Sequence, residues 1–243
     1  MSAVVAHQAR YELLSFWRRP QCRFLTLVVP VAFLVFLTAV FGDVTYYAGQ
    51  LAAVGVISAA MASIVVSATV ERENGILKRR RAAPVPATTL VAGRLTSAAI
   101  VAAATVAVIV LVAWVAYDVR LRLADLPALV LATAIGTVSF ACLGYAVASF
   151  VRSARAAIPV VLGLLVPLYL ISGVLVPADE LPSRVLAVAD AFPVRHLAQA
   201  LCAPLEPATT GSGVEGLDLL VVAAWGLAGF VVAARHFSWD PRS

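Results

Sequence analysis

Six long runs of apolar residues, separated by shorter polar segments, dominate the pattern along the chain. No Asp, Glu, Lys, Arg or His interrupts any of them. About 20 apolar residues in a helix, rising about 1.5 Å each, cross the hydrocarbon core of a bilayer, and a backbone in lipid must satisfy its hydrogen bonds internally. The pattern therefore predicts an all-α polytopic membrane protein with six transmembrane helices. The predicted spans cover residues 24–41, 48–70, 95–117, 126–151, 156–176 and 219–234.

The charges between these runs predict the orientation of the chain. If both termini are cytoplasmic, all but four of the 18 lysines and arginines fall on the inner side, but only four of the 13 acidic residues do so. The four outer basic residues are Arg120, Arg122, Arg184 and Arg195. Because a basic excess marks the cytoplasmic side of a membrane protein, the net charge of +5 is a topology signal. We therefore expect no nucleic-acid partner.

The segment before the first span has the pattern of an amphipathic helix. Within residues 2–19, one arc of the helical wheel is apolar and most of the rest is polar, and Pro20 ends the pattern. We predict a helix that lies in the inner membrane interface. The alternative is a short disordered cytosolic tail. The apolar arc holds Val5, Ala6, Ala9, Leu13, Phe16 and Trp17.

A long outer segment, residues 177–218, joins the fifth and sixth spans. Its first part is apolar but carries Arg184, Asp190, Arg195 and His196. Such charges make a full crossing costly, and Pro193 divides the segment. We predict two short helices that sit at the outer membrane edge or dip into it, followed by a turn-rich exposed loop.

The most distinctive polar stretch follows the second span, in the predicted cytosolic segment 71–94. The sequence ERENGILKRRR combines acidic residues, a turn-forming Asn-Gly pair, two apolar residues and four consecutive basic residues. The basic run serves as a positive-inside anchor. Apolar residues bordered by charges of both signs also suit a small docking element. The candidate docking residues are Glu71, Arg72, Glu73, Asn74, Gly75, Ile76, Leu77, Lys78, Arg79, Arg80 and Arg81.

Other chemistry is scarce in this chain. Composition is 62% hydrophobic and 13% charged, and soluble domains carry about 25% charged residues. Lys78 is the single lysine and Arg79 follows it, so no GxxxxGK[ST] phosphate loop exists. The histidines are scattered, and we expect no catalytic residue, cofactor or metal. The spans lack the ionisable residues that gradient-driven transporters place within the membrane.

Two further sets of residues are candidates for packing or movement. Gly55, Ala59, Ser63 and Ser67 form a small-residue stripe on the second span, suited to helix packing within the chain, to a subunit interface or to a pathway lining. Prolines can kink the fifth span where it leads to the outer helices. Aromatic residues near the span ends, Tyr46 among them, suit anchoring at the membrane boundary. The gate candidates are Pro159, Pro167, Gly173 and Pro193.

Two stretches carry a resemblance to a known family. ATVERENGILKRRRAAPVPATTLVAGRL resembles the cytosolic loop after the second span of type-2 ABC transporter permeases. LYLISGVLVPADELPSRVLAVADAFPVRHLAQAL is similar to that family's stretch from the fifth span into its re-entrant outer helices. The six-span layout and the missing ATP motif agree, so the resemblance covers nearly the whole chain, as a single permease domain over residues 1–243.

The resemblance implies the membrane subunit of an ATP-driven exporter, without an enzymatic site of its own. ATP and Mg would bind to a separate cytosolic nucleotide-binding ATPase, and the segment around Glu71–Arg81 would couple the two subunits. A second permease chain, identical or related, would complete the pathway. The compact form is similar to the drug- and antibiotic-resistance branch, but the family also exports polysaccharides and lipids. The Ala-, Val- and Arg-rich composition suggests a GC-rich bacterial genome and hence a bacterial plasma membrane.

Two functions of other classes remain open at this point. An intramembrane lipid-modifying enzyme or protease would need convergent polar groups at membrane depth, and the spans offer few besides Ser, Thr, Tyr and Cys. A secondary transporter or channel would work without ATP. The absence of intramembrane charge weighs against that class.

Overall fold

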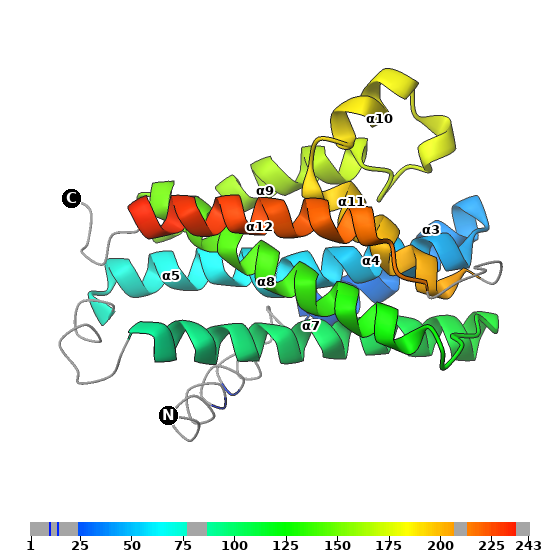
Figure 1. Cartoon of the computed structure of the whole chain (residues 1–243), viewed down its shortest axis with the longest axis horizontal. Coiled ribbons are helices and arrows are strands. Elements are labelled where there is room, and N and C mark those ends of the chain that lie inside the picture. The colour runs from blue at the N-terminus through cyan, green and yellow to red at the C-terminus, as the bar shows by residue number, and fades with distance from the viewer. Residues whose placement is uncertain (1–9, 11–13, 15–23, 77–86, 207–212, 237–243) are drawn as a thin grey trace.

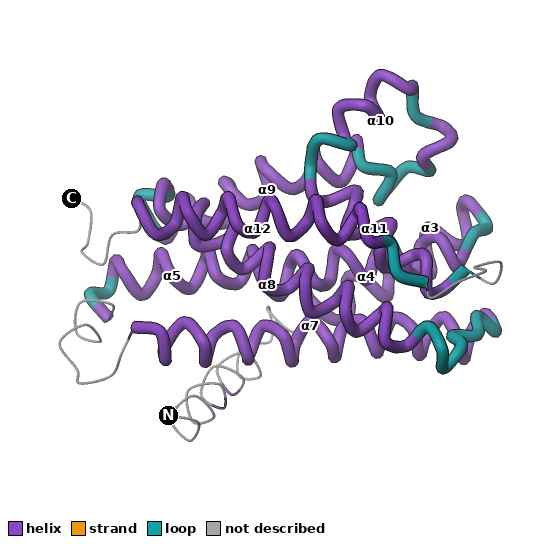
Figure 2. Tube along the Cα trace, in the orientation of Figure 1, coloured by secondary structure: helices purple, strands orange, loops and turns teal. Residues whose placement is uncertain are grey.

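The structure is a computed structural model, and it describes residues 10, 14, 24–76, 87–206 and 213–236. Every regular element in these ranges is a helix, as Figure 2 shows, so the all-α prediction is confirmed. The predicted interfacial helix lies outside the described residues except for Arg10 and Leu14, which are helical and exposed. The long helices run side by side along the longest axis of the molecule (Figure 1).

Five helices are long and apolar enough to cross a membrane within the described ranges. The second span is one helical run from Val44 to Glu73, made of α4, a π-helical turn η2 and α5. The parts of this run are α4 (Val44–Ile57), η2 (Ser58–Ala62) and α5 (Ser63–Glu73). The other four long helices are α7 (Ala87–Tyr117), α8 (Leu126–Phe150), α9 (Ala154–Ile171) and α12 (Gly216–His236).

The first predicted span is the shortest. It consists of a π-helical turn, η1 (Phe24–Val28), followed by α3 (Val29–Phe41). The 18 residues from 24 to 41 would reach about 27 Å at the rise of an α-helix, slightly less than the hydrocarbon core. Gly42 ends α3 in the left-handed region, with φ of 86°, and its amide donates to the carbonyl of Thr38.

The outer segment folds into the short helices that the prolines predict. They are η3 (Ala178–Glu180), α10 (Ser183–Ala189), α11 (Pro193–Cys202) and η4 (Ala203–Leu205). The pair Ser183–Ala189 and Pro193–Leu205 bends by 96°. In Figure 1, α10 protrudes from one end of the bundle, and α11 lies against the long helices of the bundle at the same end. Helix α5 and the start of α7 lie at the opposite end.

Small residues bring the helices close together. The second span lies at the centre, where Ala52, Val56 and Ile64 are fully buried. Helix α12 packs against α8 through Gly226 and Gly229. A Cβ atom on Gly226 would lie 2.5 Å from Oγ of Ser139, and one on Gly229 would lie 2.9 Å from the amide nitrogen of Leu143. Backbones can approach this closely only where a side chain is missing.

Candidate functional site

The inner end of the second span carries the predicted docking element. Helix α5 continues to Glu73, so the first three residues of the predicted loop 71–94 are helical, and α7 already begins at Ala87. Asn74 and Gly75 form the turn that ends α5, and Gly75 has a φ of 66°. Asn74 is exposed and Ile76 is partly buried. The remaining predicted docking residues, Leu77, Lys78, Arg79, Arg80 and Arg81, lie outside the described residues.

Glu71 forms an ion pair with Arg94, which lies in the second turn of α7. Arg94 Nη2 donates to Glu71 Oε1 at 2.6 Å, and the side chains are only 10% and 14% exposed, respectively. A charge-assisted hydrogen bond that is shielded from water is stronger than an exposed ion pair. The pair therefore ties the inner end of α5 to the inner end of α7.

Arg72 points into the protein, although it lies at the end of the second span that the charge pattern predicts to face the cytosol. Its residue surface is 2% exposed, and its guanidinium donates to the carbonyls of Ala148 (3.0 Å) and Val151. Ala148 lies in the last turn of α8 and Val151 is its C-cap residue, and the final carbonyls of a helix lack partners within it. A cation at this position also complements the negative end of the helix dipole. Arg72 therefore caps α8.

Glu73 completes the set by capping α9. Its Oε2 accepts a hydrogen bond from the amide of Ala154, the first residue of α9, at 2.7 Å. Ser153 is the N-cap and accepts from the amide of Ala156 at 3.3 Å. A carboxylate at a helix N-terminus accepts from unpaired amides and complements the positive end of the dipole.

We call Glu71, Arg72 and Glu73 the inner charged cluster. These three consecutive side chains connect the end of the second span to α7, α8 and α9. The docking hypothesis assigned these residues to a surface that contacts a partner, and the three contacts described above lie within the chain. No periodicity in the sequence could reveal this, since the contacts join residues 23 to 81 positions apart.

The small-residue stripe of the second span divides into two parts. Gly55 is buried against α7, where an added Cβ would lie 2.5 Å from Cγ2 of Thr105. Ala59 is buried as well and belongs to the π-helical turn. Ser63 is exposed and Ser67 is partly buried, and their hydroxyls donate to the carbonyls of Ala59 and Ile64. The first half of the stripe thus packs within the chain, and Ser63 faces outwards.

The gate candidates lie where the fifth span meets the outer helices. Pro159 and Pro167 are both inside α9, which continues through them. Gly173 follows α9 with a φ of 85°, and Pro193 is the first residue of α11. The structure brings Gly173 close to the second span, because the hydroxyl of Tyr46 donates to the carbonyl of Gly173 at 2.6 Å.

The outer helices are also tied to the sixth span. His196 Nδ1 on α11 lies 2.5 Å from Oδ1 of Asp218 on α12, and its Nε2 lies 2.8 Å from the carbonyl oxygen of Asp190. Arg195 forms an ion pair with Asp190 at 2.7 Å. The indole of Trp225 donates to the carbonyl of Ala191 at 3.1 Å. Polar contacts therefore hold the bend between α10 and α11 against α12.

Sequence reasoning missed the role of Tyr46, which it assigned to the membrane boundary. We expect Tyr46→Phe to lower the free energy of unfolding by about 1 kcal/mol, because it removes one hydrogen bond and keeps the ring. Thermal unfolding of the purified protein in detergent measures this change. Tyr117→Phe, which removes a hydroxyl at the outer end of α7, is the control. Equal stability of the two variants would contradict the role of the contact to Gly173.

Comparison with known proteins gives a family match that includes both the inner charged cluster and the outer helices. A family model described as ABC-2 type transporter matches residues 6–205, which include the inner charged cluster and the outer helices through η4. No curated protein sequence matches the chain.

Proposed function

Because this chain belongs to the ABC-2 type transporter family, it is a multi-pass membrane permease subunit, and we propose that it forms half of an exporter for drug-like, antibiotic or lipid-like amphiphiles. Membership makes it a transport subunit rather than an enzyme, and it implies a separate nucleotide-binding ATPase as partner. ATP and Mg therefore belong to that partner. Membrane subunits of this family carry no cofactor.

The observation that carries the proposal is the set of contacts made by the inner charged cluster. Glu71 binds Arg94 of α7, Arg72 binds the end of α8, and Glu73 binds the start of α9. A force applied just beyond α5 would therefore reach three other spans through short contacts, of which those of Glu71 and Arg72 are shielded from water. We place the ATPase contact at Asn74, Gly75 and Ile76 and at the following Leu77–Arg81, with the inner charged cluster as the link to the spans.

The proposed cargo follows from what the spans lack. Asp, Glu, Lys, Arg and His are absent from the middle of every predicted span, so the membrane interior offers no fixed charge to recognise a strongly ionic cargo or to bind a driving ion. An amphiphile with a large apolar part suits such an interior. A polysaccharide or lipid-linked glycan is the second candidate within the same family resemblance.

We also propose that two permease chains, identical or related, form the complete pathway. Helix α9 supports this, because much of its surface is apolar and exposed in the single chain, including Ile158 (57%) and Leu162 (54%). The proline-containing α9 and the small residues Ser63 and Ser67 are the candidates for facing the pathway. In this arrangement Gly173 and the bend at Pro193 form the outer gate.

We expect Ile76→Asp to weaken association with the ATPase by about tenfold, because truncating or charging an apolar anchor costs about 1–3 kcal/mol. Co-purification of the ATPase from membranes measures association. Inhibitory concentrations for a panel of amphiphilic antibiotics, in cells that produce both subunits, measure export. Ile76 lies beyond α5 and is only partly buried, so the unfolding temperature should stay unchanged.

Ile76→Val is the matched control, since it keeps an apolar side chain and should preserve both readouts. Full association and full antibiotic protection with Ile76→Asp would reject the docking role. If the unmodified chain associates normally with the ATPase but protects cells against no amphiphile, the docking role stands and the proposed cargo is wrong.

A further inference from the structure

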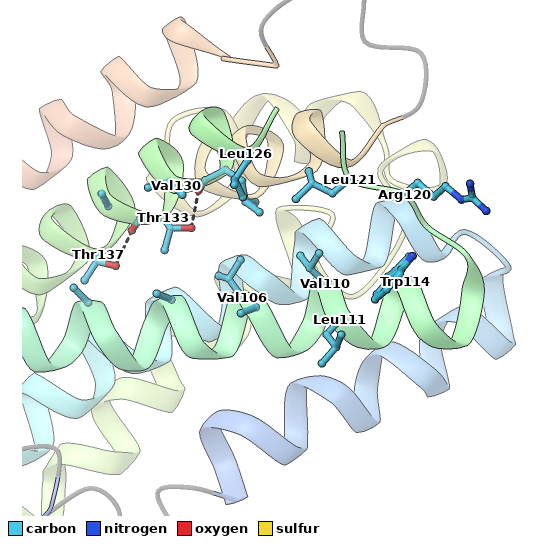
Figure 3. Close-up of a pocket in the computed structure, with 15 residues that line it drawn as sticks. Val106, Val110, Leu111, Trp114, Arg120, Leu121, Leu126, Val130, Thr133 and Thr137 are labelled. Atoms are coloured by element: carbon cyan, nitrogen blue, oxygen red, sulfur yellow. Dashed lines mark hydrogen bonds between the residues drawn. The ribbon is translucent and has the colours of Figure 1, made fainter. Parts of the chain in front are cut away.

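A groove of about 940 Å³ runs between α7 and α8 on the side of the molecule shown in Figure 3. Apolar side chains from both helices line it, and the turn between the helices closes one end. Several of these side chains are well exposed, among them Leu111 (53%) and Val130 (59%). The residues along the groove are Ala99, Ala103, Val106, Ala107, Val110, Leu111, Trp114, Arg120, Leu121, Leu126, Leu129, Val130, Thr133, Ala134 and Thr137.

The lining of the groove suits an apolar ligand. Its two threonine hydroxyls are already satisfied, because Thr133 donates to the carbonyl of Leu129 at 2.8 Å and Thr137 donates to that of Thr133 at 2.7 Å. Figure 3 shows both bonds directed along α8. A ligand needs no polar group at this depth, and a buried polar group without a partner would weaken binding.

The length of the groove matches one leaflet of a bilayer. From Leu126 to Thr137 the groove follows α8 for about 17 Å, at about 1.5 Å per residue. Half of a hydrocarbon core of about 30 Å is about 15 Å. The groove therefore suits a molecule that enters from one side of the membrane and ends near its middle.

The closed end of the groove carries charges of both signs. Arg120 lines the groove and forms an ion pair with Asp118 at 3.1 Å, with side chains 79% and 73% exposed. Asp118 adopts a left-handed conformation with a φ of 57°. The indole of Trp114 lies at the same end (Figure 3), where aromatic residues meet the lipid head groups. The second pair in this turn, Arg122 with Asp125, is also balanced.

From this geometry we infer that the groove binds a zwitterionic phospholipid of the outer leaflet. Its acyl chains lie along α7 and α8, its phosphate contacts Arg120, and its ammonium group contacts Asp118. An exposed pair of opposite charges complements a head group that carries both signs. Guanidinium has five N–H donors, so Arg120 can hold a phosphate while its Nε stays on Asp118. The inference depends on the outward orientation of this turn and is independent of the ATPase and of the cargo.

The test measures lipid that stays bound to the full chain. The protein is reconstituted in nanodiscs of equal phosphatidylethanolamine and phosphatidylglycerol, extracted again in mild detergent, and analysed for phospholipid by mass spectrometry. We expect the unmodified chain to retain about one phosphatidylethanolamine. Ala107→Phe fills the groove, and Arg120→Glu repels the phosphate. Each should reduce retention by about tenfold, as expected for the loss of about 1.4 kcal/mol of binding.

Two matched controls separate specific binding from general effects. Ala104→Phe changes an exposed position on α7 outside the groove, and Arg184→Glu reverses another outer exposed arginine. Both should retain the lipid. Retention that is equal in all variants, or that shows no preference between the two head groups, overturns the inference. If Ala107→Phe instead separates dimers in a mass measurement and leaves bound lipid unchanged, a second copy of the chain covers the groove and the inference is wrong.

Discussion

Replacing Glu71 with lysine is expected to reduce ATP-driven transport to background while the chain still inserts into the membrane. The new ammonium group would lie against Arg94 in a site where both native side chains are mostly shielded from water. Two like charges in such a place cost about 3 kcal/mol or more relative to the native pair. Transport in proteoliposomes that contain the permease and its ATPase measures the loss, and protease protection of the outer segment measures insertion.

The exchanged pair distinguishes a contact within the chain from a contact with the ATPase. Adding Arg94→Glu to Glu71→Lys restores opposite charges at the same place, so we expect most of the transport to return. If Glu71 instead met a cation on the ATPase, the exchange would leave transport at background. That second outcome would return Glu71 to the docking surface and contradict the arrangement of the inner charged cluster.

Arg72→Ala should have the second large effect, on stability as well as on transport. It leaves the carbonyls of Ala148 and Val151 without the guanidinium that now binds them. Losing two charge-assisted hydrogen bonds at a buried helix end costs about 3 kcal/mol. We expect a clearly lower unfolding temperature in detergent and loss of ATP-driven transport, because the inner end of the second span would separate from α8.

Arg155→Ala is the control for this substitution. Arg155 lies on the same side of the membrane, in the first turn of α9, and is exposed. Its removal should change the unfolding temperature little, since exposed charges contribute about 0–1 kcal/mol. Arg72→Lys keeps the charge but not the planar, two-pronged donor geometry, so it should fall between the two. Unchanged stability of Arg72→Ala would contradict the capping role.

The helical spans were predictable because the bilayer imposes its requirements locally. A run such as 126–151 is apolar throughout, and a helix is the one way to satisfy its backbone in lipid; the structure has α8 at Leu126–Phe150. Pro193 likewise marked the start of α11. A proline has no backbone N–H, and the N–H groups in the first turn of a helix have no acceptor within the helix, so proline fits there. Helix ends were less predictable. Glu71 to Glu73 continue α5 because their charges are satisfied by other helices.

The candidate site shows the same division. The sequence pointed to the residues after the second span as a docking element, since two apolar residues there lie between a turn flanked by charges and a run of four basic residues. It could not indicate that Arg72 would be buried against the C-terminal end of α8, because the carbonyls that accept its hydrogen bonds belong to Ala148 and Val151. The contact of Tyr46 was equally hidden from the sequence, because its hydroxyl donates to the carbonyl of Gly173, which lies 127 positions further along the chain.

The sequence alone thus determined the all-α membrane architecture and the absence of a GxxxxGK[ST] phosphate loop, and it predicts the orientation from basic residues, because each depends on residue type and on neighbours along the chain. Tertiary structure decided which charged side chains bind other groups of the same chain, which half of the small-residue stripe is packed, and where α7 and α8 leave an open groove. Those features depend on helices that are distant in sequence, and the distance between two such helices is set by packing that no local pattern records.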